Sequence, residues 1–353
     1  MEQDAGGDSS SAWGDEETQF FFELTPDRIL AAVESAGVKC TGRCLQLNSL
    51  ENRVYEVELD IDDDKLPSRA PERFRIVKFY RPGRWSRQQI NEEHQFLIDL
   101  NSAELPVIVP GFFKDGSTLQ ETPESGILFS MFPKQGGRLK DELNDQEVEQ
   151  LGRLLARVHN IGETKKLEHR LLLDVETYGW QNLDYILDSE IVPEALFDSY
   201  EQTAVQALEN MEPLFEGVPY QRIHGDCHCG NILWGSNGPF LVDFDDCVSG
   251  PCVQDFWLLV GADDEVGLKQ REKFITGYEQ MRPFDWSTIR LIEPLRTLRY
   301  IHFTAWIAKR WDDPAFSNAF PDFGSPRYWQ EAVSDLREQC AKIQEAQWGG
   351  VNY

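Results

Sequence analysis

Three oxygen-bearing side chains occur at the ends of short apolar runs in the second half of the chain. One run leads into Asp226, Asn231 follows five residues later, and a second run, residues 240–242, precedes Asp243. Phosphoryl transfer uses such a set, because one carboxylate positions the attacking hydroxyl while an amide and a second carboxylate hold magnesium on the phosphates. The pattern predicts Asp226 and Asp243 as catalytic residues, with Asn231 and Asp243 as metal ligands.

The interval from Asp226 to Asn231 matches the protein-kinase catalytic loop, H-R-D-x-x-x-x-N, with Gly225 in place of the arginine. Two polar turns of an unrelated α/β domain are the alternative, but the interval, the flanking runs and the second aspartate agree with the kinase pattern. Eleven residues separate Asp243 from Asp255, which leaves no room for a phosphorylated activation loop. We expect Asp255 to cap the helix that it begins and to hold the catalytic loop.

The segments that precede this stretch predict a small antiparallel sheet. Thr25 and Pro26 begin a short helix over residues 28–35, with Thr25 as its N-cap. The expected strands are short and β-branched or alternating, and they lie at residues 44–47, 53–59, 73–80, 106–110 and 126–133. We interpret residues 25–132 as a nucleotide-binding N-lobe.

Lys78 and Glu93 are candidates for holding ATP in this lobe. Lys78 lies mid-strand between apolar neighbours, where a lysine commonly points to solvent. The next helix, residues 86–101, carries Glu93 beside its apolar stripe, so the two side chains can meet. Kinases use such a pair to hold the α- and β-phosphates. Glu92 is the competing carboxylate.

Two further ATP-binding candidates come from a loop and a strand. The loop at residues 48–52 contains no glycine, so a phosphate cradle there must use backbone N–H groups, asparagine side chains and the Ser49 hydroxyl. An ordinary hairpin turn rich in Asn and Ser fits the same residues. Met131 lies on the apolar strand that leaves the lobe, where an adenine would find backbone hinge groups, although edge-strand packing is equally allowed.

Residues 133–353 predict a mostly helical C-lobe that carries catalysis and substrate binding. The first expected helix begins at residue 144 and is apolar on one face. The other expected helices lie at residues 193–215, 253–259, 267–281, 287–311 and 325–346. His159 near the end of the first is interpreted as structural. The fold class is therefore α+β and bilobal, with a small antiparallel-sheet N-lobe.

The overall charge restricts the partners. With 34 Lys+Arg against 61 Asp+Glu the net charge is -27, which argues against nucleic-acid and anionic-membrane binding. Residues 1–24 are acidic and rich in Gly and Ser, lack the layout of a signal peptide, and are expected to be a disordered tail. We expect a cytoplasmic protein with reduced thiols, and a monomer because no coiled-coil seam is sustained.

Four cysteines and an imidazole lie within or just after the catalytic stretch, residues 222–246. Cys227, His228 and Cys229 follow the catalytic aspartate, and Cys247 and Cys252 follow Asp243. Their spacing is unlike the usual zinc pairs. A redox-sensitive thiol is the second alternative, and inert packing is the default interpretation.

These motifs resemble the aminoglycoside phosphotransferase and choline kinase branch of the protein-kinase-like fold. The resemblance rests on HGDCHCGNILW at residues 224–234 and VDFDD at 242–246. More narrowly, the chain is similar to the bacterial stress response kinase A family. That similarity extends from about Thr25 to the last helix, and it is carried by NSLENRVY at 48–55, EEHQF at 92–96 and AWIAKRWDDPA at 305–315.

The resemblance implies an ATP-dependent, Mg²⁺-requiring serine/threonine protein kinase of the cytoplasm, with a protein substrate that includes the kinase itself as a candidate. It implies Asp226 as the base, Asn231 and Asp243 as magnesium ligands, and Ser49 as a contact to ATP. Asp245 departs from the kinase D-F-G motif by replacing its glycine. A small-molecule kinase acting on an aminoglycoside, choline or another amine alcohol is the main alternative, and a catalytically dead scaffold is a weaker one because all transfer residues are present.

Overall fold

The computed structural model describes residue 21 and residues 24–62, 66–123, 125–262 and 264–348. The expected tail, residues 1–24, lies almost entirely outside this part of the chain. Phe21 is described, and its ring is buried against two arginines, with the Cζ atoms of Arg53 and Arg81 at 5.0 and 5.3 Å from the ring centroid. Phe21 therefore packs on the N-lobe.

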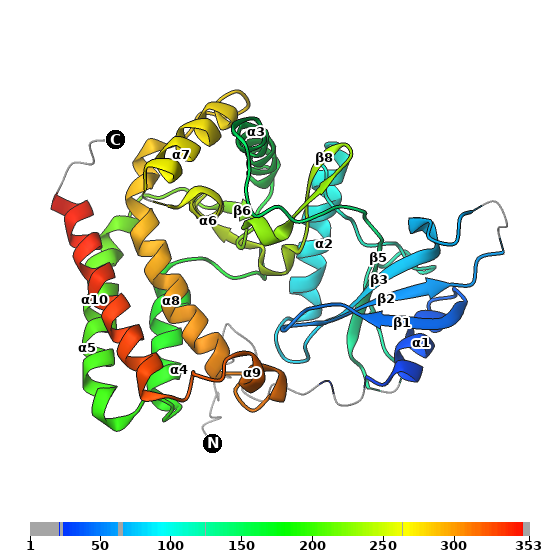
Figure 1. The fold of residues 1–353 in the computed structure, drawn as a ribbon, viewed down its shortest axis with the longest axis horizontal. Helices are drawn as coiled ribbons and strands as arrows, with labels where there is room; N and C mark the ends of the chain where they lie inside the picture. Colours follow the sequence, from blue (N-terminus) through cyan, green and yellow to red (C-terminus); the bar gives the residue numbers. More distant parts are fainter. Residues whose placement is uncertain (1–20, 22–23, 63–65, 124, 263, 349–353) are drawn as a thin grey trace, which may run out of the picture.

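The N-lobe is built on a five-stranded antiparallel sheet with the strand order β1-β2-β3-β5-β4 (Figure 1). Its strands are β1 (Cys40–Gln46), β2 (Arg53–Leu59), β3 (Phe74–Phe79), β4 (Gln120–Glu121) and β5 (Leu128–Pro133). Helix α1 (Pro26–Ser35) covers one face, and the Thr25 hydroxyl caps it by accepting from Arg28 N at 3.4 Å. The antiparallel sheet, the helix and its cap agree with the sequence prediction.

The strand expected at residues 106–110 does not form. Val107 makes a single parallel bridge to Leu241, and the Pro106 carbonyl accepts from Leu241 N at 3.0 Å. A proline stands at each end of this segment, and proline has no N–H to donate to a ladder. The prediction also missed β4, which has two residues and therefore no alternating pattern to detect.

Helix α2 (Arg87–Ser102) packs between the sheet and the second lobe. A capping box begins it, because Ser86 Oγ accepts from Gln89 N while Gln89 Oε1 accepts from Ser86 N. Its buried face includes Glu93 and Phe96, and the Phe96 ring meets the Phe244 ring edge-on at 5.7 Å. This contact joins the helix to the segment that follows Asp243.

The C-lobe is mostly helical, as expected. Its helices are α3 (Asp145–Gly162), the π-helix η2 (Val175–Trp180), α4 (Gln181–Asp188), α5 (Glu194–Met211), α6 (Val253–Val260), α7 (Glu265–Tyr278), α8 (Ile292–Ala308), α9 (Pro314–Ala319) and α10 (Pro326–Trp348). Figure 1 shows α10 beside α5, and α8 contacts both α10 and α4. The prediction missed η2, α4 and α9, which are too short to show a strong helical period.

Two short antiparallel ladders carry the catalytic stretch between the lobes. Strand β6 (Gln221–Ile223) pairs with β9 (Val248–Gly250), and β7 (Ile232–Gly235) pairs with β8 (Gly238–Leu241). The structure thus confirms a bilobal α+β fold. Within the described residues, no helix combines the length and the apolar character that a membrane crossing requires.

Candidate active site

A cavity of about 750 Å³ is lined by residues of both lobes. The loop between β1 and β2 and strand β3 line it from the N-lobe, and helix α8 and the catalytic stretch line it from the C-lobe. The structure brings six of the seven predicted site residues to this cavity: Ser49, Lys78, Glu93, Asp226, Asn231 and Asp243.

Met131 is the exception, and its prediction as a cofactor contact is not supported. It pairs with Val77 and packs on the N-lobe core, and its carbonyl accepts from Gly111 N at 2.7 Å. Neighbouring Phe132, which pairs with Ile76, lines the cavity together with that residue. Successive side chains of a strand point to opposite faces, so a shift of one residue changes the face.

Asp255 holds the catalytic loop at the end of β6. Its Oδ2 accepts from His224 N at 2.9 Å, and its Oδ1 accepts from Gly225 N at 2.8 Å. His159 Nε2 lies 3.2 Å from the same carboxylate, in agreement with a structural role for that histidine. The expected capping role is wrong, since Cys252 is the N-cap of α6 and makes no side-chain cap bond.

The backbone conformation explains the glycine where kinases have arginine. Gly225 has a φ of 85°, in the left-handed region, and a Cβ built on it would lie 2.1 Å from the carbonyl oxygen of Asp246. A side chain at this position would strain the backbone and displace the neighbouring segment. The loop that presents Asp226 therefore packs directly against the chain that follows Asp243.

Asp226 is held by three side chains. Asn231 Nδ2 donates to its backbone carbonyl at 2.9 Å, and Arg299 Nη1 donates to its Oδ1 at 2.8 Å. His228 Nε2 lies 3.3 Å from its Oδ2, and Gly230 N donates to His228 Nδ1 at 3.0 Å, which leaves the proton of a neutral ring on Nε2. Burial raises the pKa of Asp226, but His228 and Arg299 together hold it below its ordinary value.

Lys78 is surrounded by carboxylates rather than by one partner. Its Nζ lies 2.9 Å from Asp245, 3.2 Å from Asp243 and 3.7 Å from Glu93. Burial lowers the pKa of Lys78, but these three groups raise it well above its ordinary value, so the amine stays charged. The predicted pair with Glu93 forms, yet Asp245 lies closer to the lysine. The aspartate at the glycine position of the D-F-G motif was the sequence feature that could have indicated this second partner.

Glu93 and Glu92 have separate tasks. Glu93 pairs with Arg170 at 3.0 Å as well as with Lys78. Glu92 accepts instead from the backbone N–H groups of Glu168 and Arg170, at 2.6 and 2.8 Å. The competing carboxylate therefore fixes a C-lobe loop and does not contact the lysine.

Asp243 and Asn231 present oxygen atoms to the cavity. Asp243 has φ 58° and ψ 69°, a left-handed conformation that is costly for a residue with a Cβ, and its side chain is 56% exposed. Asn231 directs its amide nitrogen at Asp226, which leaves its Oδ1 available. A carboxylate and an amide oxygen suit magnesium, which keeps phosphate oxygens and waters as its other ligands.

The cysteines near the site are free thiols, and the innermost two are buried. Burial raises the pKa of Cys247 to about 12 and that of Cys227 well above its ordinary value, so both are protonated at neutral pH. Among the residues that the structure describes, no three or more His, Cys, Asp or Glu side chains are placed to hold a metal ion. The geometry favours packing over the zinc and redox alternatives for these two thiols.

Arg299 was missed by the sequence prediction. It lies on α8, 73 residues after Asp226, in a helix that offers no local motif to mark it. Tyr178, which also lines the cavity, lies on the π-helix that the prediction missed. Both lie in the C-lobe, to which the sequence analysis assigns substrate binding.

Comparison with known proteins assigns the chain to a family. A model of the phosphotransferase enzyme family matches residues 44–292. Stress response kinase A of Escherichia coli (strain K12) is 37% identical over 326 residues, which is 92% of this chain and 95% of that protein. A Salmonella typhimurium (strain LT2) protein named serine/threonine protein kinase RdoA is 37% identical over 328 residues, with the same coverage.

Solved structures share the fold at low identity. Amicoumacin kinase hAmiN, in complex with AMP-PNP, Ca²⁺ and Ami, has a TM-score of 0.65 and 20% identity, covering 86% of this chain and 92% of that one. Choline kinase LicA from Streptococcus pneumoniae has a TM-score of 0.59 and 16% identity, covering 88% and 99%. With the cavity and its catalytic loop, these matches show that the chain belongs to the phosphotransferase enzyme family, as a kinase related to the bacterial stress response kinases A.

Proposed function

We propose that the protein is an ATP- and Mg²⁺-dependent serine/threonine kinase that transfers the γ-phosphoryl group to a protein hydroxyl. The observation that carries the proposal is the position of Asp226, Asn231 and Asp243 on one cavity with a charged, buried Lys78. The names of the relatives support a protein acceptor and a role in stress response. We further propose that it acts in the cytoplasm, as a monomer.

Asp226 acts as the base in this proposal. Its depressed pKa keeps the carboxylate ionised at neutral pH, ready to accept a hydrogen bond from the acceptor hydroxyl. A weak base is sufficient, because the transition state of phosphoryl transfer is loose and the proton leaves late. Positioning of the hydroxyl and neutralisation of charge supply most of the rate.

The other residues of the cavity hold the nucleotide. Lys78 contacts the phosphates, while Glu93 and Asp245 keep its amine charged and in place. Ser49 contacts the phosphates from the loop between β1 and β2. Magnesium at Asn231 and Asp243 would neutralise charge on the phosphates.

A small-molecule kinase for amine alcohols is the second candidate, and the charges beside the base disfavour it. Unpaired carboxylates would favour an amine acceptor, but Asp245 and Asp246 are both paired with Arg84. Arg299 places a cation directly on Asp226, where a bound amine would be repelled. A neutral serine or threonine hydroxyl meets no such repulsion.

Transfer of labelled phosphate from ATP decides between the candidates. The purified protein is incubated with labelled ATP and Mg²⁺ alone, with a generic protein acceptor, and with amine alcohols. We expect label in the protein fraction, including the kinase itself if it is its own substrate, and none in the Asp226→Asn variant. Label recovered in the amine alcohols instead would refute a protein acceptor.

A further inference from the structure

We infer that Glu51 is the positioning residue of the loop that stands where other kinases have a glycine-rich loop. It holds the loop between β1 and β2, residues 47–52, over the nucleotide phosphates by pairing with helix α8 of the opposite lobe. The inference rests on the proposed nucleotide binding and names the residue on which the phosphate contacts of that loop depend.

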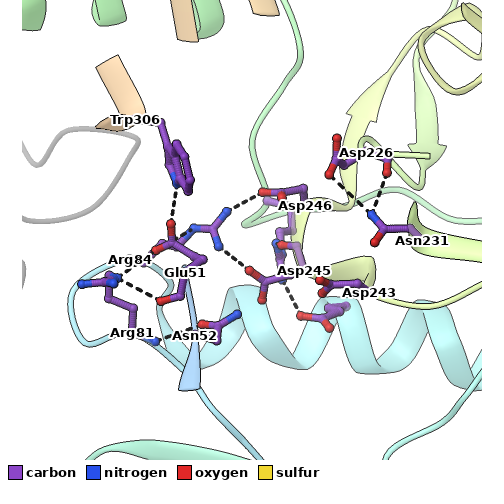
Figure 2. Close-up of polar contacts among 12 residues, drawn as sticks. Glu51, Asn52, Arg81, Arg84, Asp226, Asn231, Asp243, Asp245, Asp246 and Trp306 are labelled. Atoms are coloured by element: carbon purple, nitrogen blue, oxygen red, sulfur yellow. Dashed lines mark hydrogen bonds and ion pairs between the residues drawn. The ribbon is translucent and has the colours of Figure 1, made fainter. Parts of the chain in front are cut away.

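The carboxylate of Glu51 joins the two lobes. Trp306 Nε1 donates to its Oε2 at 2.5 Å, and Arg310 reaches both oxygens, with Nε 2.8 Å from Oε2 and Nη2 2.9 Å from Oε1. Both partners come from the C-terminal end of α8 and the turn after it. Figure 2 shows the carboxylate between Trp306 on one side and the N-lobe arginines on the other.

Arg81 fixes the loop backbone around this carboxylate. Its Nε donates to the Glu51 carbonyl at 3.0 Å and its Nη2 to the Leu50 carbonyl at 3.1 Å, while its own N–H donates to Asn52 Oδ1 at 3.1 Å. The same guanidinium pairs with Asp313 of the C-lobe at 3.0 Å. The loop is therefore held by its carbonyls as well as by the Glu51 side chain.

A chain of ion pairs connects Glu51 with the lysine that faces the phosphates. Arg84 Nε lies 3.7 Å from Glu51, and its Nη1 and Nη2 pair with Asp245 and Asp246. Asp245 in turn lies 2.9 Å from Lys78 Nζ. Figure 2 shows Arg84 between Glu51 and the two aspartates. The loop and Lys78 are thus positioned by one connected network of ion pairs.

Glycine-rich loops bind phosphates because their backbone can approach closely and adapt. This loop contains no glycine, and all six of its residues line the cavity. A loop that cannot adapt must be placed correctly before the nucleotide binds. Glu51, whose side chain is 13% exposed and contacts both lobes, provides that placement.

The test compares affinities for nucleotides with and without phosphates. Dissociation constants for ATP with Mg²⁺ and for adenosine are measured by titration calorimetry on the wild type and on Glu51→Gln, which keeps the shape of the side chain and removes its charge. We expect at least a tenfold weaker affinity for ATP and no change for adenosine. In the double variant with Arg310→Met, the ATP affinity should equal that of Glu51→Gln alone, because both changes break the same link.

A matched control is Asp99→Asn, which removes another largely buried carboxylate paired with two cations, Lys165 and Arg222, away from the cavity. Its ATP affinity should stay within about twofold of the wild type. If Glu51→Gln weakens the affinities for ATP and for adenosine equally, or weakens neither, this inference is overturned while the proposed function stands. A wild-type protein that does not bind ATP would overturn the proposed function and this inference with it.

Discussion

The ion pairs of Glu51 also contribute to stability, in a way that depends on pH. Burial raises the pKa of this carboxyl, but Arg310, Arg84 and Arg81 lower it further, to about 2 from an ordinary value of 4.5. The native state therefore binds fewer protons than the unfolded state between these pH values. The stabilisation is complete above pH 4.5 and is lost as the pH falls towards 2.

The pKa difference sets the size of the effect. At 1.36 kcal/mol for each factor of ten, the gap between 4.5 and 2 corresponds to about 3 kcal/mol of unfolding free energy at pH 7. Integration over pH removes about 1 kcal/mol of this at pH 4 and about 2 kcal/mol at pH 3. Replacement by Gln, which cannot ionise, should remove the part of this stabilisation that the wild type still has at each pH.

Urea unfolding followed by far-UV circular dichroism measures this contribution at pH 7, 4 and 3. Urea is preferred to guanidinium because a salt would screen the ion pairs. We expect Glu51→Gln to be less stable than the wild type by about 3 kcal/mol at pH 7, with the difference narrowing by about 2 kcal/mol at pH 3. The exposed Glu209→Gln in α5 is the control, with no such narrowing. A difference that stays constant with pH would refute the reasoning.

Four further variants test the catalytic loop and the residues that contact it. Asp226→Asn should lower kcat by at least about a thousandfold with ATP affinity retained, whereas Asp243→Asn should also lose the metal-dependent part of that affinity; full activity in either contradicts its role. In Gly225→Ala the new Cβ would lie 2.1 Å from the Asp246 carbonyl. This variant should lower the melting temperature and reduce kcat by at least about tenfold. Normal values of both would show that the loop tolerates a side chain. Arg299→Met should raise the pKa of Asp226, so the acidic limb of the pH–rate profile should move to higher pH; an unmoved limb argues against the contact.

Much of the local structure could be predicted because it depends on neighbouring residues. Helix starts follow from short-range capping, as at Thr25, Ser86 and Asn144, where each side chain accepts from a backbone N–H two or three residues later. The catalytic loop is local in the same sense, since Asp226 and Asn231 are joined by a hydrogen bond across five residues. The face of a strand residue is harder to predict: Phe132 lines the cavity while its neighbour Met131 does not, because one step along a strand selects the opposite face.

The sequence by itself determined the antiparallel sheet, the principal helices and the types and order of the residues that could transfer a phosphoryl group. The tertiary structure alone decided which charges meet. Lys78 pairs with Asp245 as well as Glu93, Arg299 reaches Asp226 from α8, and Glu51 meets Trp306 across 255 residues of chain. The physical reason is that a charge is compatible with many local sequence patterns, while its partner depends on how distant helices and strands pack together.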